Sequence, residues 1–127
     1  MNKGKLIIYW VATALLSVGM LGSGIAQLMR AKEMVSILTH LGYPLYLMSI
    51  LGTWKILGVI AILVPGFKLL KEWAYAGLFF TMTGALVSHL IMGDSGKAIM
   101  GPAAQTIFIV LSWYCRPANR KIDIAKL

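Results

Sequence analysis

One lysine lies in the middle of an apolar stretch, in the segment LGTWKILGVI at residues 51–60. Apart from Lys55, the run from Leu41 to Val64 contains no charged residue. A lysine at the centre of a membrane-spanning helix costs roughly 2.5 to 3.5 kcal/mol on insertion scales, so that an ionisable residue there is by default a functional one. Lys55 is therefore the first residue at which we expect chemistry, provided that the run crosses a membrane.

The composition favours a membrane protein. Of the 127 residues, 59% are hydrophobic and 13% are charged, whereas soluble domains are roughly 45 to 50% apolar and about 25% charged. Crossing a hydrocarbon core about 30 Å thick takes ~18 or more apolar residues in a helix. With the run around Lys55, the chain has four such stretches, at about 6–29, 45–64, 73–92 and 98–115.

These stretches predict an all-α fold, in which residues 1–127 form one integral membrane domain, an antiparallel four-helix bundle. The run Leu6–Met29 is expected to remain as a span, because the core of a cleaved signal is only ~7 to 15 residues long. Between the first two spans, apolar residues from Met34 to Leu41 recur at roughly helical spacing. This segment is either a short amphipathic helix along the membrane surface or an ordinary connector.

The basic residues predict the orientation of the bundle, since lysine and arginine collect in short cytoplasmic segments. One side carries Lys3, Lys5, Lys68, Lys71, Arg116, Arg120, Lys121 and Lys126, and the other carries Arg30, Lys32 and Lys97. Both termini are therefore expected in the cytoplasm. The net charge of +8 is ascribed to attraction by anionic lipids and not to nucleic-acid binding, because no folded basic surface is left over.

Small residues predict which helix faces meet, because membrane helices approach closely where side chains are small. Gly52 and Gly58 lie three residues before and after Lys55, which places the lysine on an inward face. In the third span a stripe of small residues is also expected to face the bundle. Its members are Gly77, Thr81, Gly84 and Ser88. The comparable stripes are Ala98, Gly101, Gln105 and Ser112 in the fourth span and Ala12, Gly19, Ser23 and Ala26 in the first.

A polar layer is predicted at the depth of Lys55. At ~1.5 Å of rise per residue, Lys55, Gln105, Thr81 and Ser17 all lie about 12 to 16 Å from the cytoplasmic ends of their spans. No carboxylate shares this layer, so the partners available to Lys55 within the chain are these neutral groups and backbone carbonyls. Together with the neighbouring Trp54, the four residues form a hypothetical binding site for a lipophilic anionic or quinone-like ligand.

Polar residues nearer the span ends have structural explanations. Glu72 is expected in the first turn of the third helix, where the helix dipole favours an acid. His89 is expected to hydrogen-bond across helices. His40, His89, Glu33 and Asp94 all belong to the outer side, but their spacing matches no metal-ligand motif, and we predict no metal site.

No enzyme template fits the chain. There is no Ser/His/Asp set, no pair of carboxylates within the membrane and no haem motif. Cys115 is the only cysteine, which excludes an intrachain disulfide. We therefore predict no catalytic residue and do not expect an enzyme acting on its own.

The order of several short motifs resembles the DoxX-like family of small bacterial membrane proteins. The motifs are LGYP (41–44), LGTWKILG (51–58), PG (65–66), KEWAYAG (71–77) and SHLIMGD (88–94). The resemblance covers about 9–115, implies a four-helix bundle, and places Lys55, Glu72 and His89 within family-like motifs. It also implies several functions, since related proteins are associated with a thiosulfate:quinone oxidoreductase, with a complex for thiol and superoxide defence, and with assembly of nicotinic receptors.

Three hypotheses follow. The favoured one is a binding or accessory membrane protein that holds a lipophilic anionic or quinone-like ligand at Lys55, with no other cofactor identified. The second is an assembly chaperone or scaffold, in which Lys55 pairs with a carboxylate of a partner membrane protein, or in which copies of the chain associate. The third is a subunit of a quinone-linked oxidoreductase or a small transporter. A proton-coupled transporter needs an acid within a span, which this chain lacks.

Overall fold

The computed structural model describes residues 2–120 of the chain, and within this range every regular element is helical. The all-α prediction is confirmed. Lys121 and Lys126, which contributed to the predicted orientation, lie outside the described residues. The elements are α1 (Lys3–Leu28), α2 (Lys32–Leu41), α3 (Leu47–Leu63), α4 (Lys68–Ile91), α5 (Gly96–Tyr114) and the 3-10 helix η1 (Ala118–Arg120).

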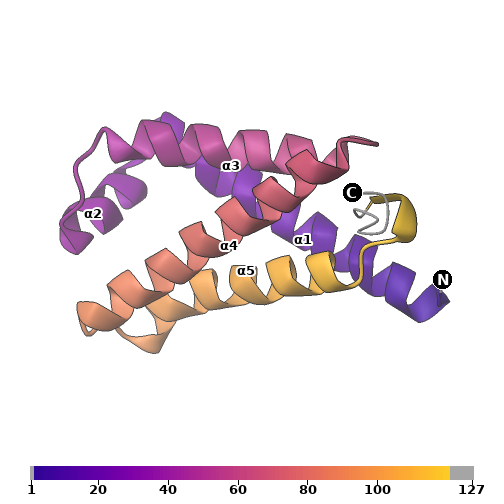
Figure 1. The fold of residues 1–127 in the computed structure, drawn as a ribbon. Helices are drawn as coiled ribbons and strands as arrows, with labels where there is room; N and C mark the ends of the chain where they lie inside the picture. Colours follow the sequence, from indigo (N-terminus) through magenta and orange to yellow (C-terminus); the bar gives the residue numbers. More distant parts are fainter. Residues whose placement is uncertain (1, 121–127) are drawn as a thin grey trace.

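The four longer helices run in alternating directions (Figure 1). α1 packs against α3 and α5, and α4 packs against the same two helices. The amino terminus, the α3–α4 connection and η1 lie at one end of the molecule, while α2 and the α4–α5 connection lie at the other (Figure 1). α2 is the short helix that the sequence offered as one of two alternatives for this segment. It separates α1 from α3 along the chain, and Gly42 ends it with φ 83°, a left-handed conformation that suits glycine.

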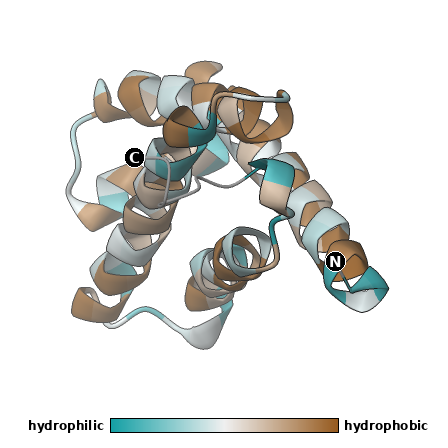
Figure 2. Ribbon diagram, turned by 45° about the vertical axis from the view of Figure 1, so that its right-hand side comes forward, coloured by the Kyte–Doolittle hydropathy of each residue, from teal (hydrophilic) through white to brown (hydrophobic). Residues whose placement is uncertain are grey.

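Two helices, α1 and α4, are long and apolar enough to cross a membrane, and α3 is a shorter apolar helix of 17 residues. Hydrophobic residues are spread along the four longer helices (Figure 2), and many of their large apolar side chains are exposed. Examples are Ile7, Val18, Leu57, Phe80, Ile91 and Ile107. Soluble monomers rarely expose apolar patches of this extent, whereas a surface of this kind suits a lipid environment.

Glycines bring α1 and α3 into close contact beside Lys55. A Cβ atom added at Gly52 would lie 2.7 Å from the carbonyl oxygen of Gly24 and 2.9 Å from Cγ of Leu28. Only a residue without a side chain fits there. One turn further along α3, Lys55 is 6% exposed, so that the predicted inward orientation is confirmed.

The small-residue stripe of the third span faces the inside of the bundle only in part. Thr81, Gly84 and Ser88 line a cavity among the helices, but the two glycines of the stripe do not pack against a neighbouring helix. Gly77 and Gly84 are exposed, and a Cβ atom at either would meet nothing within 4 Å. α4 instead buries larger residues, among them Tyr75, Leu78 and Met82. These pack into the main core with Leu16, Met20, Val59, Ile62 and Ile109. Large side chains gain more dispersion contacts than glycines do, so α4 turns them to the core and leaves the stripe open.

Buried hydrogen bonds connect three helices near the end that holds the amino terminus. The hydroxyl of Ser112 on α5 lies 2.6 Å from Oγ1 of Thr13 on α1 and 2.7 Å from Oη of Tyr75 on α4. All three side chains are buried. Hydroxyls that find partners across helices in this way fix the relative rotation of those helices.

Two cations bind the carboxyl end of α3. The buried Lys71 ammonium donates to the carbonyls of Ala61, at 2.7 Å, and Val64, and the Arg120 guanidinium donates to those of Ile62, at 2.9 Å, and Leu63. The last carbonyls of a helix have no partner within it, and the helix dipole favours positive charge there. Lys71, one of the basic residues used to predict the orientation, therefore also stabilises the fold by binding the end of α3.

Glu72 does not have the role predicted for it. α4 begins at Lys68, four residues before Glu72, so the acid lies beyond the first turn, where the helix dipole has little effect. Its carboxylate instead accepts from the Arg116 guanidinium at 2.6 Å and from Nε1 of Trp113 at 3.0 Å. Glu72 therefore ties α4 to the end of α5.

The crossing of α1 and α3 predicts a specific sensitivity to side-chain size. Gly52→Ala should destabilise the protein by about 1 to 3 kcal/mol, because the added methyl group overlaps the backbone of α1. Gly77→Ala is the matched control, since its methyl group meets open space. Denaturant titration of both variants in mild detergent measures the difference, and equal stability of the two variants would contradict the described crossing.

Candidate functional site

A cavity of about 820 Å³ lies among the five α-helices. Its volume is within the range of about 300 to 1,000 Å³ found for small-molecule sites. The apolar part of its lining includes Met20, Met34, Leu38, Leu51, Phe80 and Met82. The polar part includes Gln27, Glu33, Lys55, Thr81, His89 and Gln105. The cavity thus combines apolar walls with a few polar groups, as lipophilic ligands with a polar end require.

Polar groups on the cavity wall lack partners. In the part of the chain that the structure describes, Lys55 makes no hydrogen bond or ion pair, and Oε1 of Gln27 and Oε1 of Gln105 are buried without a hydrogen-bond partner. Buried polar atoms in folded proteins are nearly always hydrogen-bonded, and each exception needs an explanation. All three residues line the same cavity, so a molecule bound there can supply the missing partners.

Three of the five residues predicted to bind a ligand line this cavity, namely Lys55, Gln105 and Thr81. The Gln105 side chain lies against Gly19 of α1, in space that a Cβ atom would fill. Thr81 uses its hydroxyl to donate to the carbonyl of Gly77, at 2.7 Å, in its own helix. Neither residue is therefore the hydrogen-bond partner of Lys55 that the polar layer led us to expect.

The other two predicted residues lie elsewhere. Ser17 is buried, its hydroxyl has no partner, and it is not part of the cavity lining. Trp54 is 63% exposed and lines a second hollow of about 400 Å³ between α3 and α4. Lys55 also lines this second hollow. Adjacent residues on a helix point about 100° apart, so the inward orientation of Lys55 carries Trp54 to the outside.

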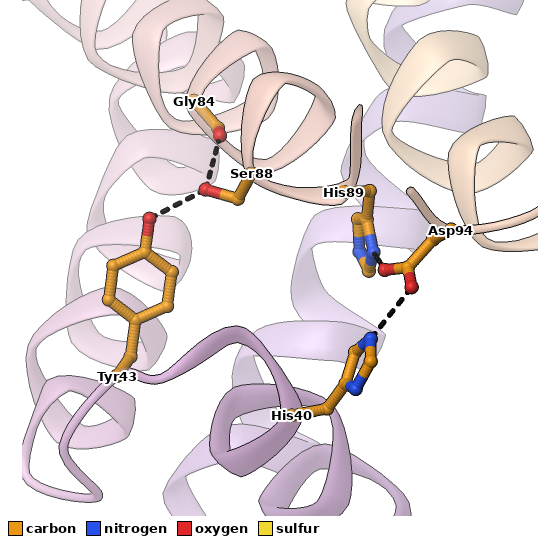
Figure 3. Close-up of polar contacts among 6 residues, drawn as sticks. All are labelled: His40, Tyr43, Gly84, Ser88, His89 and Asp94. Atoms are coloured by element: carbon orange, nitrogen blue, oxygen red, sulfur yellow. Dashed lines mark hydrogen bonds and ion pairs between the residues drawn. The ribbon is translucent and has the colours of Figure 1, made fainter. Parts of the chain in front are cut away.

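The α2 segment covers one end of the cavity. Residues of α2 from Glu33 to Leu41 contribute to the lining. Just beyond α2, Oη of Tyr43 lies 2.6 Å from the hydroxyl of Ser88 on α4, and that hydroxyl also contacts the carbonyl of Gly84 at 2.8 Å (Figure 3). The segment is thus attached to α4 across the cavity.

A second attachment uses two histidines and an aspartate. Oδ1 of Asp94 lies 2.7 Å from Nε2 of His40 on α2, and Oδ2 lies 2.6 Å from Nδ1 of His89 on α4 (Figure 3). These hydrogen bonds, first that of His89 and then that of His40, lower the pKa of the Asp94 carboxyl. The partner of His89 is therefore the α4–α5 connection and not another helix, contrary to our expectation.

The sequence had grouped His40, His89 and Asp94 with Glu33 while rejecting a metal site. The structure brings three of the four together, as hydrogen-bond partners. Among residues 2–120, no group of three such side chains is arranged to hold a metal ion. The site predicted from the sequence did not include Gln27, although a glutamine near the end of an apolar run indicates a polar site within the bundle.

The attachment of α2 generates a prediction. Asp94→Ala should increase hydrogen exchange of the α2 amides at neutral pH, because both imidazoles lose their common acceptor. In the wild type the same loosening should appear in acid. The lowered pKa of Asp94 means that its contribution is complete above the ordinary aspartate value of about 3.9 and disappears as the pH falls through the lowered value.

Mass-spectrometric hydrogen exchange of the peptides from 32–41, corrected for the intrinsic pH dependence of exchange, measures this effect. Glu33→Gln is the matched control, since Glu33 lies on α2 and makes no ion pair within the described residues. Unchanged exchange in Asp94→Ala would show that these hydrogen bonds do not hold α2 in place.

The comparisons with known proteins agree with the resemblance noted in the sequence. The model of the DoxX-like family matches residues 11–114, which include the cavity-lining helices and the motifs around Lys55, Glu72 and His89. No curated protein and no solved structure matches the chain significantly. Because the family match covers most of the chain, this protein belongs to the DoxX-like family and is a small membrane protein.

Proposed function

We propose that this protein is an integral four-helix bundle of a bacterial inner membrane that binds a lipophilic molecule in the cavity, with an anionic or carbonyl-bearing end at Lys55. Family membership and the two helices that can span a membrane support the location. The cavity supports the binding role. In this proposal α3 and α5 also cross the bilayer, since each packs against both α1 and α4.

The distribution of cations and aromatic rings supports an orientation with the amino terminus in the cytoplasm. Nζ of Lys5 lies 4.9 Å from the ring centre of Tyr114, and the Arg120 guanidinium lies 5.0 Å from that of Trp10. Cytoplasmic ends of membrane proteins are rich in lysine and arginine, and aromatic rings settle at the interface. Both features are found at the end of the bundle that holds the amino terminus and η1.

The unpartnered Lys55 is the observation that carries the proposal. A lysine within a bundle normally pairs with an acid or with backbone carbonyls, and a charge buried without a partner is strongly destabilising. The carboxylate of a lipophilic acid, or the carbonyl of a quinone, would accept from the ammonium, while Gln105 would take part through its amide. A bound quinone would supply redox chemistry, for which the described residues provide only the binding site.

One observation favours a scaffold as the second candidate. Lys55 also lines the hollow on the outside of α3 and α4, where a helix of a partner protein carrying a carboxylate would reach it. Exposed glycines such as Gly77 would let that helix approach closely. The same experiment distinguishes the two candidates, because the bound species has a different mass.

We expect wild-type protein, purified in mild detergent, to carry a small lipophilic molecule in native mass spectra. Lys55→Met should lose it, with an affinity about ten- to hundred-fold lower, which corresponds to the ~1.5 to 3 kcal/mol of a hydrogen bond to a charged group. Lys32→Met is the control, since Lys32 is exposed and outside the cavity lining. Equal occupancy in all three proteins would refute the proposed site, and loss of a second protein instead would establish the scaffold.

Without a bound ligand, the Lys55→Met substitution should increase the stability of the protein. Lys55→Met is expected to unfold at a higher denaturant concentration than the empty wild type, because it replaces an unpaired buried ammonium by an apolar chain of similar length. The comparison uses protein stripped of lipid by detergent exchange. A less stable Lys55→Met variant would mean that the ammonium already has a stabilising partner within the chain.

A further inference from the structure

The second hollow lies on the outer surface of the molecule, along the seam between α3 and α4. Its lining is mostly apolar and includes exposed residues of both helices, such as Trp54 on α3 and Trp73 on α4. Since large apolar residues are exposed along both α3 and α4, this hollow would face lipid chains in a bilayer. A groove of this kind suits the apolar tail of a single lipid-like molecule.

The two hollows meet at the same side chains. Lys55 and Thr81 are common to both linings. The helices that carry them touch near their connection, where a Cβ atom at Gly58 would lie 3.3 Å from the Leu78 side chain, and they diverge toward the end that holds α2 (Figure 1). The cavity and the groove therefore adjoin at Lys55 and Thr81.

The backbone of α4 is open on the groove side. Gly77 lines the groove, and a Cβ atom there would meet nothing within 4 Å. By contrast, the end of the cavity beneath α2 is covered, and the cover is attached by the Tyr43 hydroxyl and by the His40–Asp94 hydrogen bond (Figure 3). Among residues 2–120, the side-chain hydrogen bond from α4 to α3 is at their connection, from Lys71 to Ala61, and none joins the two helices at Lys55 or Thr81, whereas two hydrogen bonds hold the cover at the α2 end.

We propose that the occupant of the cavity is a membrane-dissolved lipophilic acid that enters between α3 and α4, with its carboxylate drawn past Thr81 to Lys55 and its tail following through the groove. This inference rests on the proposed function and adds a substrate class and a route. Among residues 2–120, Lys55 is the one buried lysine in the cavity lining, and its ammonium, which has no hydrogen-bond partner there, selects one negative charge. The apolar groove selects a chain that is already in the bilayer. Gly77 provides the width of the passage.

The kinetics of uptake test the route. cis-Parinaric acid, a fluorescent fatty acid, is mixed in a stopped-flow instrument with protein reconstituted in phosphatidylcholine vesicles. The part of the energy transfer from the four tryptophans that Lys55→Met lacks reports arrival of the acid at the site. In Gly77→Leu the added side chain occupies the groove, so both uptake and release should be several-fold slower than in the wild type. Gly22→Leu is the matched control, because Gly22 is an exposed glycine of α1 with open space around it, and its rates should equal those of the wild type.

A second variant tests the alternative route past α2. Asp94→Ala removes the acceptor shared by the two histidines and should leave both rates unchanged. Faster uptake in Asp94→Ala, with Gly77→Leu behaving like the wild type, would overturn the proposed route. A lower affinity in Gly77→Leu without slower rates would also overturn it, since the groove would then be the binding site itself.

The proposed function fails in a different way. If wild-type protein does not take up cis-parinaric acid, or if Lys55→Met binds it with wild-type affinity, there is no acid site at Lys55, and the route falls with it. If binding depends on Lys55 but Gly77→Leu does not slow the rates, the site stands and only the route is wrong.

Discussion

A lysine side chain buried among apolar helices is the constraint on which this structure depends. The hydrocarbon core of a bilayer holds no water, so a polar group at that depth needs a partner from the protein, from a water-filled cavity or from a ligand. α3 presents Lys55 to the inside because Gly24 and Gly52 bring the backbones of α1 and α3 together one turn away. The Lys55 side chain then lines a cavity, and no carboxylate of the described residues forms an ion pair with it. The fold thus places the Lys55 side chain in the lining of both hollows, without a hydrogen-bond partner among residues 2–120.

Polar side chains at the two ends of the molecule are hydrogen-bonded, whereas several in the middle lack partners among the described residues. At the end with the amino terminus, Lys71 binds the final carbonyls of α3, and Ser112 joins three helices through hydroxyls. At the other end, Asp94 joins two histidines. Between them, Oε1 of Gln27 and Oε1 of Gln105 are buried without partners among residues 2–120, and Lys55, which makes no hydrogen bond there, lines the same cavity. Fully hydrogen-bonded polar networks stabilise a fold, whereas buried polar groups without partners lower its stability unless a ligand binds to them.

Much of the fold could be predicted from local patterns, because the helices follow from apolar runs and the inward face of α3 from glycines around one lysine. Pairs of residues distant in the sequence could not. The partners of Glu72 and Lys71 depend on where α4 begins and on how it is rotated. The stripe at Gly77 misled us for a related reason, since small residues indicate where a backbone can be approached and not whether a neighbour does so. Trp54 was included in the predicted site because it is adjacent to Lys55 in the sequence, but adjacent residues of a helix point in different directions.

The most direct test of the account is to map where a bound acid touches the protein. A fatty acid carrying a photoactivatable diazirine near its carboxylate would be irradiated with the reconstituted protein, and the labelled peptides identified by mass. We predict labelling of cavity-lining segments around Lys55, Thr81 and Gln105, which an excess of unlabelled fatty acid suppresses. Labelling that is confined to outward residues such as Val18 and Ile107, and that competitor does not suppress, would contradict the central claim that the bundle holds an acid at Lys55.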